Sequence, residues 1–182
     1  QSSARDRGPD GNGTFTMPLD FTTSNLTLSG GTLTGACNIT PNAFTWSAGT
    51  MSGTGITTVP SGVTWGISGY PTLARALNND GDCTWSFNGY ITINAGGTFR
   101  NRSGASFHVR GDGVLYGAST GAFENQAGAL FETSVATGLT TVQTITVTNL
   151  GTVQLQTGTL DLGNGGVFNN QGMVQTSAGT QL

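Results

Sequence analysis

An asparagine followed two or three residues later by a glycine recurs five times between residues 77 and 172 of this sequence. The asparagines are Asn79, Asn101, Asn125, Asn149 and Asn170, and the glycines are Gly81, Gly104, Gly128, Gly151 and Gly172. Successive asparagines are roughly 21 to 24 residues apart, and an apolar residue stands two positions before each. Repeats of about 20 to 50 residues are typical of solenoids and related arrays, so this period constrains the fold more than any other feature.

Short strands joined by Asn/Gly turns at this period predict an all-β fold, a β-solenoid (parallel β-helix) of about 7 to 8 coils with roughly 21 to 24 residues each. In such a fold each coil pairs its backbone with the coils on either side, about 4.8 Å away, and inward side chains form a narrow core. We expect left-handed backbone angles at the asparagines and glycines, which tolerate them best. We also expect the stacked asparagine side chains to hydrogen-bond from coil to coil.

The composition agrees with strands and excludes largely helical folds. The 182 residues include 31 threonines and 30 glycines but no lysine and only two glutamates, so strong helix formers are scarce. The six arginines form no basic stripe and the formal net charge is −3, which excludes nucleic acid as an expected partner. No apolar run approaches the roughly 18 residues of a membrane span, so no membrane insertion is expected.

The first third lacks the asparagine motif but is also rich in glycine and threonine, with apolar residues at alternating positions. The runs at 46–55 (WSAGTMSGTG), 61–64 (SGVT), 77–81 (LNNDG) and 149–160 (NLGTVQLQTGTL) resemble the repeats of large bacterial cell-surface and adhesin-like β-helix proteins. The resemblance covers about residues 25–182, which we assign to the solenoid body. It implies the same fold and an extracellular or cell-surface location, and it brings no catalytic signature. The chain departs from the pattern in being short and in carrying two cysteines at strand positions.

Residues 1–24 are assigned to an N-terminal arm or first strand. The chain begins at Gln1 without a methionine or an apolar leader, as expected for a secreted protein after signal-peptide removal. An apolar face is formed by Phe15, Met17, Leu19 and Phe21, which alternate with polar residues or proline. Two interpretations stay open: this segment adds a strand to a neighbouring subunit, or it forms the first strand of its own subunit.

The expected ends of the solenoid predict self-assembly. No amphipathic helix or charged edge follows Gly172, and an open last coil that matches an open first coil makes a head-to-tail contact, which produces filaments. The sequence therefore predicts a structural subunit of an extracellular filament or surface fibre, a homopolymer whose partner is itself. The alternative is an adhesin or carbohydrate-binding passenger segment of a larger surface protein, with glycans as partners. A polysaccharide lyase or another enzyme ranks third.

Candidate catalytic and metal-binding residues are dispersed in the sequence. His108 is expected on the outer face of a strand with no partner assigned by spacing, and the acidic residues Asp112, Glu124, Glu132 and Asp161 are expected on different coils and surfaces. Asp80 and Asp82 could bind calcium loosely, but a solvated turn is favoured because the spacing of an EF-hand fails. The sequence predicts a protein that is not an enzyme and needs no metal or cofactor. The tripeptide at 110–112 (RGD) is interpreted as an ordinary turn.

Three further features of the sequence are relevant to a surface protein. The sequence leaves open whether Cys37 and Cys83 form an intrachain disulfide or two buried free thiols, and an intersubunit bridge ranks below both. Glycosylation sequons occur at Asn12, Asn25, Asn38 and Asn101, a number close to that expected by chance, and we hypothesise a glycoprotein whose sugar coat supplies solubility. A threonine ladder of the kind that binds ice is absent from the segments aligned on the asparagine motif.

Overall fold

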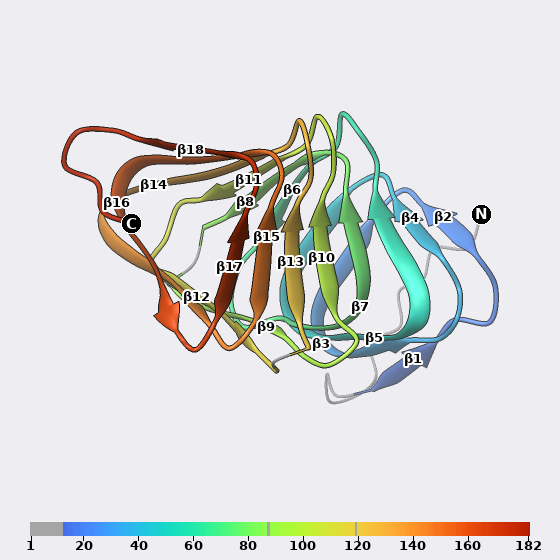
Figure 1. The fold of residues 1–182 in the computed structure, drawn as a ribbon. Coiled ribbons are helices and arrows are strands. Elements are labelled where there is room, and N and C mark those ends of the chain that lie inside the picture. Colours follow the sequence, from blue (N-terminus) through green and yellow to red (C-terminus); the bar gives the residue numbers. More distant parts are fainter. Residues whose placement is uncertain (1–12, 87, 119) are drawn as a thin grey trace.

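The computed structural model describes residues 13–86, 88–118 and 120–182, and in these it contains 18 β-strands and no helix (Figure 1). The strands are β1 Thr14–Thr16, β2 Phe21–Thr23, β3 Leu26–Thr34, β4 Ile39–Pro41, β5 Phe44–Val59, β6 Thr64–Ile67, β7 Thr72–Asn79, β8 Asp82–Trp85, β9 Gly89–Ile93, β10 Thr98–Asn101, β11 Ser106–Val109, β12 Gly113–Gly117, β13 Ala122–Asn125, β14 Leu130–Gln143, β15 Thr146–Asn149, β16 Thr152–Asn164, β17 Val167–Asn170 and β18 Met173–Thr176.

The strands wind into a parallel stack of coils. Every pairing between named strands is parallel and joins residues that lie about one coil apart in the sequence. Long strands such as β5 and β14 bend around corners and take part in more than one face of the stack (Figure 1). The chain is a β-solenoid of about seven turns, as the repeat period predicts.

Three faces surround the core, and we name each for the side chains that it carries. The ladder face contains β2, β4, β10, β13, β15 and β17 with the C-terminal parts of β5 and β7. The histidine face contains β6, β8, β11 and β18 with the N-terminal parts of β3, β5, β14 and β16. The tyrosine face contains β1, β9 and β12 with the remaining parts of β3, β5, β7, β14 and β16.

The coils near the N-terminus are shorter than the sequence predicts. Stacked positions on the ladder face are Phe21, Ile39, Thr57, Leu77, Phe99, Phe123, Val147 and Phe168. Successive members are about 18 to 20 residues apart up to Leu77 and about 21 to 24 residues apart beyond it, so the predicted period holds only for the later coils. In the earlier coils Thr23, Pro41 and Val59 stand where asparagine stands later, which is why an alignment on asparagine could not find their period.

Apolar side chains at alternate strand positions form one continuous core. Aromatic rings stack along its axis, with ring centroids 4.9 Å apart for Phe44 and Trp65 and 5.1 Å apart for Phe99 and Phe123. Because these rings pack on rings of neighbouring coils, they stabilise the stacking of successive coils.

Residues 13–24, the described part of the segment that the sequence assigns to an N-terminal arm, belong to this chain's own first coil. Strand β1 pairs with β3, and β2 pairs with β4. Phe15, Met17 and Phe21 are half-buried against the core, whereas Leu19 is 75% exposed. Of the two interpretations left open by the sequence, the structure shows the second, in which these residues belong to their own solenoid.

Candidate functional site

The asparagines of the repeat form a hydrogen-bonded ladder inside the corner between the ladder face and the histidine face. The Nδ2 of each asparagine donates to Oδ1 of the next, at 2.9 Å for Asn79 to Asn101, 2.9 Å for Asn101 to Asn125, 2.8 Å for Asn125 to Asn149 and 2.8 Å for Asn149 to Asn170. The first four side chains are buried and Asn170 is exposed. Each of these Nδ2 atoms also donates to a backbone carbonyl of the next coil, for example Asn125 to Thr152 at 3.0 Å. Buried amides that are satisfied in this way fix the register of the coils.

The backbone at these turns differs from the sequence expectation. Gly104 and Gly128 have φ of 83° and 79°, as expected for left-handed positions. None of the ladder asparagines has a positive φ, and neither do Gly81, Gly151 and Gly172. A Cβ on Gly81 or Gly172 would lie 2.2 Å from a carbonyl oxygen of the preceding coil, and one on Gly151 would lie 2.4 Å from such an oxygen. These three glycines are therefore required by close approach between coils rather than by backbone angle.

The four sequons have different environments. Asn101 is fully buried in the ladder, so it cannot accept a sugar in the folded chain, and this part of the glycosylation hypothesis is wrong. Asn25 and Asn38 are exposed. The Asn38 carboxamide donates to Asp20 at 3.0 Å and accepts from the backbone N–H of Ile56 at 3.0 Å, and hydrogen bonds from Asn38 lower the pKa of Asp20. Asn12 lies outside the described residues.

Cys37 and Cys83 are both buried and free, so the disulfide that the sequence left open is not formed. They lie on different faces: Cys83 stacks in register between Trp65 and Phe107 on the histidine face, whereas Cys37 lies shortly before β4 of the ladder face. Burial raises the pKa of the Cys83 thiol well above its ordinary value, with a smaller contribution from the charge of Asp82.

Arg75 is a buried cation that sequence reasoning missed. Its guanidinium donates to three backbone carbonyls, from Nε to Gly55 at 2.9 Å, from Nη2 to Cys37 at 2.7 Å and from Nη1 to Ser52 at 3.3 Å. Desolvation lowers its pKa, and Coulombic attraction to Cys37 and a hydrogen bond that Arg75 donates to Cys37 oppose that shift. The alternation from Leu73 to Leu77 was the available signal, because it assigns Arg75 to an inward position.

A charged network lies on the outer side of the histidine face. His108 Nε2 lies 3.2 Å from Asp82 Oδ1, and His108 Nδ1 lies 3.2 Å from Arg110 Nη2 and 3.5 Å from Glu132 Oε1. Arg110 also pairs with Glu132, whose side chain is 8% exposed, and donates to Ser134. The structure therefore gives His108 partners that the spacing in the sequence could not assign. Stacking of β8, β11 and β14 brings these groups together from three coils.

The charged network links neighbouring coils, and both imidazole nitrogens of His108 take part in it. A guanidinium only donates, so Nδ1 of His108 accepts from Arg110, and Nε2 lies within ion-pair distance of the Asp82 carboxylate. A general base needs an unoccupied nitrogen that faces substrate, and this arrangement provides none. In the RGD tripeptide, Arg110 is held by this network, and Asp112 accepts from the N–H of Leu139 at 3.1 Å while its own N–H donates to Asn88 at 2.8 Å.

The acids of the 80–82 turn also have partners. Asp80 pairs with Arg102 at 3.1 Å, and Asp82 faces His108. Among the described residues no group of three or more histidine, cysteine and acidic side chains is arranged to hold a metal ion.

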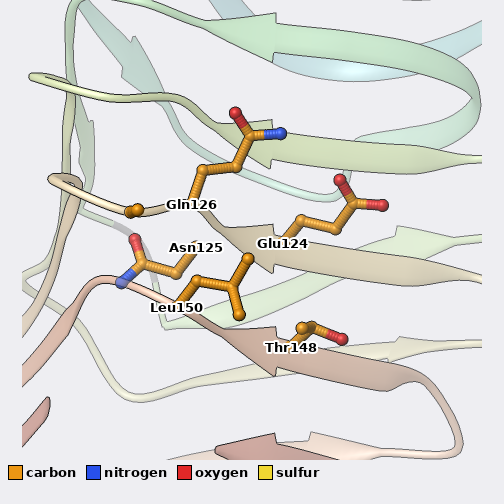
Figure 2. Close-up of a pocket in the computed structure, with 6 residues that line it drawn as sticks. Glu124, Asn125, Gln126, Thr148 and Leu150 are labelled. Carbon is orange, nitrogen blue, oxygen red and sulfur yellow. The ribbon is translucent and has the colours of Figure 1, made fainter. Parts of the chain in front are cut away.

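A shallow depression of about 360 Å³ lies beside the ladder (Figure 2). Glu124, Asn125 and Gln126 line it from β13 and the following turn, and Thr148 and Leu150 line it from the next coil. Its one acidic group, Glu124, is paired with Arg100 at 3.0 Å, and the Asn125 amide is used in the ladder. The Glu124 carboxylate and the Asn125 amide are therefore both engaged by other residues of the solenoid.

Comparison with protein-family models, with curated proteins and with solved structures gives no match to this chain. The fold that the adhesin-like resemblance implies is shown by the structure, and membership of that class stays an expectation. No helix in the described part of the chain is long and apolar enough to cross a membrane.

Proposed function

We propose that this chain is a structural protein that assembles end to end into an extracellular filament. In the proposed contact, the coil with β17 and β18 of one copy stacks on the coil with β2 and β3 of the next. The observation that carries the proposal is the chemical continuity of the core columns between these two coils.

The coil with β17 and β18 presents an open strand edge. Among the described strands, β17 pairs only with β15 and β18 only with β16, so their other edges have no partner. Phe168 and Val174 continue the core columns and are half-buried, and the flanking Val167 and Met173 are 52% and 54% exposed. Unpaired edges with apolar neighbours favour pairing with another strand.

The first coil offers matching side chains at the same column positions. Phe168 belongs to the column that begins with Phe21, and Val174 belongs to the histidine-face core, which begins with Leu26 and Leu28. Asn170 belongs to the corner column that begins with Thr23, a hydroxyl that can accept the next hydrogen bond of the ladder. A second copy therefore continues the apolar columns with apolar residues and the asparagine column with a hydrogen-bond acceptor.

Electrostatics do not oppose this contact. Residues 167–182 contain no charged side chain, and between residues 13 and 34 Asp20 is the one charged residue. Stacking these segments brings no like charges together. The contact joins different surfaces of the two copies, so it propagates instead of closing into a dimer.

The proposed location is extracellular, because the sequence resembles cell-surface repeats. In this proposal the filament is not an enzyme, and exposed Asn25 and Asn38 are its candidate glycosylation sites. The adhesin or carbohydrate-binding alternative has its own structural support on the tyrosine face.

Two variants that block opposite ends test the contact. Val174→Asp places a charge in the terminal core column, and Leu26→Asp does so at the first coil. We expect the wild type to show concentration-dependent growth in sedimentation velocity, each variant alone to stay monomeric, and a 1:1 mixture to form only dimers through its two unblocked ends. Leu150→Asp adds the same charge at an exposed position of an interior coil and should still polymerise. A wild type that stays monomeric at all concentrations would contradict the proposal, and so would polymerisation of both end variants.

A further inference from the structure

Three tyrosines are the exposed aromatic side chains of the described structure. Tyr70, Tyr90 and Tyr116 are 58%, 50% and 45% exposed, whereas the described phenylalanines and tryptophans are buried or half-buried. All three lie on the tyrosine face, on three successive coils. The rings of Tyr70 and Tyr90 stack with centroids 6.0 Å apart and an interplanar angle of 30°. These three aromatic rings lie together on one face, whereas the described phenylalanine and tryptophan rings belong to the core or pack against it, so core packing does not explain them.

A column of hydroxyl groups runs beside the rings. Thr14, Thr32, Thr50, Thr72 and Thr92 are stacked in register on five coils, and Tyr116 occupies the next position of the column. Thr16 and Thr34 begin a second column two residues further along their strands. A column of single threonines, which the segments aligned on the asparagine motif do not contain, therefore exists on another face, where coils of about 18 to 22 residues separate its members.

These columns carry no charge. Alternation turns Leu33, Met51, Leu73 and Ile93 inward, and the outward positions beside them are threonine, serine, alanine and asparagine. The closest charged residue in sequence to Tyr116, Asp112, is hydrogen-bonded to the backbone of Leu139. A neutral ligand suits this surface, because a polyanion finds no cation here and a polycation finds no free row of carboxylates.

We propose that the tyrosine face binds a neutral polysaccharide that runs along the solenoid axis over Tyr70 and Tyr90. The apolar C–H face of a pyranose packs on an aromatic ring, and its hydroxyl groups hydrogen-bond with threonine Oγ1 atoms. Coils spaced about 4.8 Å apart repeat these groups at intervals close to the length of one sugar unit. The site does not depend on the proposed filament contact, since it lies on the side of the solenoid and involves neither β17 nor β18.

Retention on insoluble polysaccharides tests this inference, with microcrystalline cellulose and chitin as neutral probes and polygalacturonate gel as an anionic one. We expect the wild type to bind a neutral probe, and the Tyr70→Ala/Tyr90→Ala variant to bind it about tenfold more weakly. Leu150→Ala, a matched change of an exposed apolar residue on another face, should bind as the wild type does. Thr72→Val/Thr92→Val keeps the shape and removes the hydroxyls, and a several-fold loss is expected.

Three outcomes would overturn the inference. The first is no retention of the wild type on either neutral probe. The second is equal retention of the wild type and the double tyrosine variant, with both folded by circular dichroism. The third is a change in self-association, measured by sedimentation, without a change in retention, which would identify a second copy of the chain as the occupant. End-blocked Val174→Asp should retain binding, so failure of filament assembly and failure of sugar binding are distinguishable.

Discussion

The indole N–H of Trp65 donates to Oδ1 of Asn79 at 2.8 Å, and both side chains are buried. This bond completes the asparagine ladder at its first member. In the preceding coil the corner position is Val59, which has no amide to donate. Trp65, from the histidine face, supplies the missing donor, so a ladder built on one face depends on a side chain from another.

The interior of the ladder should be critical for stability. Asn125→Ala removes the acceptor of Asn101 and the donor to Asn149 and to the Thr152 carbonyl. Because buried polar groups are then left without partners, we expect a loss of about 2 to 4 kcal/mol in the free energy of unfolding, measured by chemical denaturation. Asn169→Ala, at an exposed position next to Asn170 in the sequence, should lower the free energy of unfolding by less than about 0.5 kcal/mol. Equal losses of unfolding free energy in the two variants would show that the buried ladder stabilises the fold no more than an exposed asparagine does.

Substitution of Arg75 should lower the free energy of unfolding more than substitution of a surface arginine. Arg75→Met leaves the carbonyls of Gly55, Ser52 and Cys37 without their donor inside the core, and we expect a loss of about 3 kcal/mol or more. Arg100→Met breaks the part-exposed pair with Glu124 and should cost no more than about 1 kcal/mol. Denaturation of both variants under the same conditions measures the difference, and a smaller loss for Arg75→Met would contradict this account.

Two glycines of the repeat should respond differently to alanine. At Gly151 a Cβ would meet the Ala129 carbonyl oxygen at 2.4 Å, so the coils must move apart. At Gly104 nothing lies within 4 Å, and the cost is the strain of φ at 83°, about 1 to 2 kcal/mol. We therefore expect Gly151→Ala to lower the midpoint of thermal unfolding further than Gly104→Ala. The reverse order would refute the assignment of Gly151 to close approach.

Stability should fall at alkaline pH because of Cys83. Burial raises the pKa of this thiol in the folded chain, so above its ordinary value of 9.0 the unfolded chain loses a proton that the folded chain keeps. The contribution is thus fully present below pH 9.0 and is lost as pH rises beyond it, by up to about 1.4 kcal/mol per pH unit. Unfolding measured from pH 8 to 10.5 should show a shallower decline in Cys83→Val than in the wild type. Identical slopes would contradict the prediction.

The repeat predicted the later coils well, because one residue type marks one corner in each. From Leu77 onward the asparagine spacing gives the coil length, the inward apolar column and the ladder itself. The earlier coils have Thr23, Pro41 and Val59 at that corner, so no single residue type marks their shorter length in the sequence.

Contacts within the other two faces could not be predicted in the same way. Whether Asp82 reaches His108 depends on how turns of different length bring β8 and β11 into register. On the tyrosine face, the register of β5 with β7 likewise brings Thr50 and Thr72 into one threonine column. The spacing of the asparagine motif predicts the register of stacked residues only on the ladder face, where the motif lies.

Electron microscopy of the purified chain over a range of concentrations, followed by helical reconstruction, will show whether the coils of successive copies stack end to end. Eight stacked strand levels about 4.8 Å apart predict uniform filaments with an axial rise of roughly 40 Å per subunit, in which β17 pairs in parallel with β2 of the next copy. Short rods of a single length at every concentration would contradict end-to-end stacking, as would filaments joined through their sides.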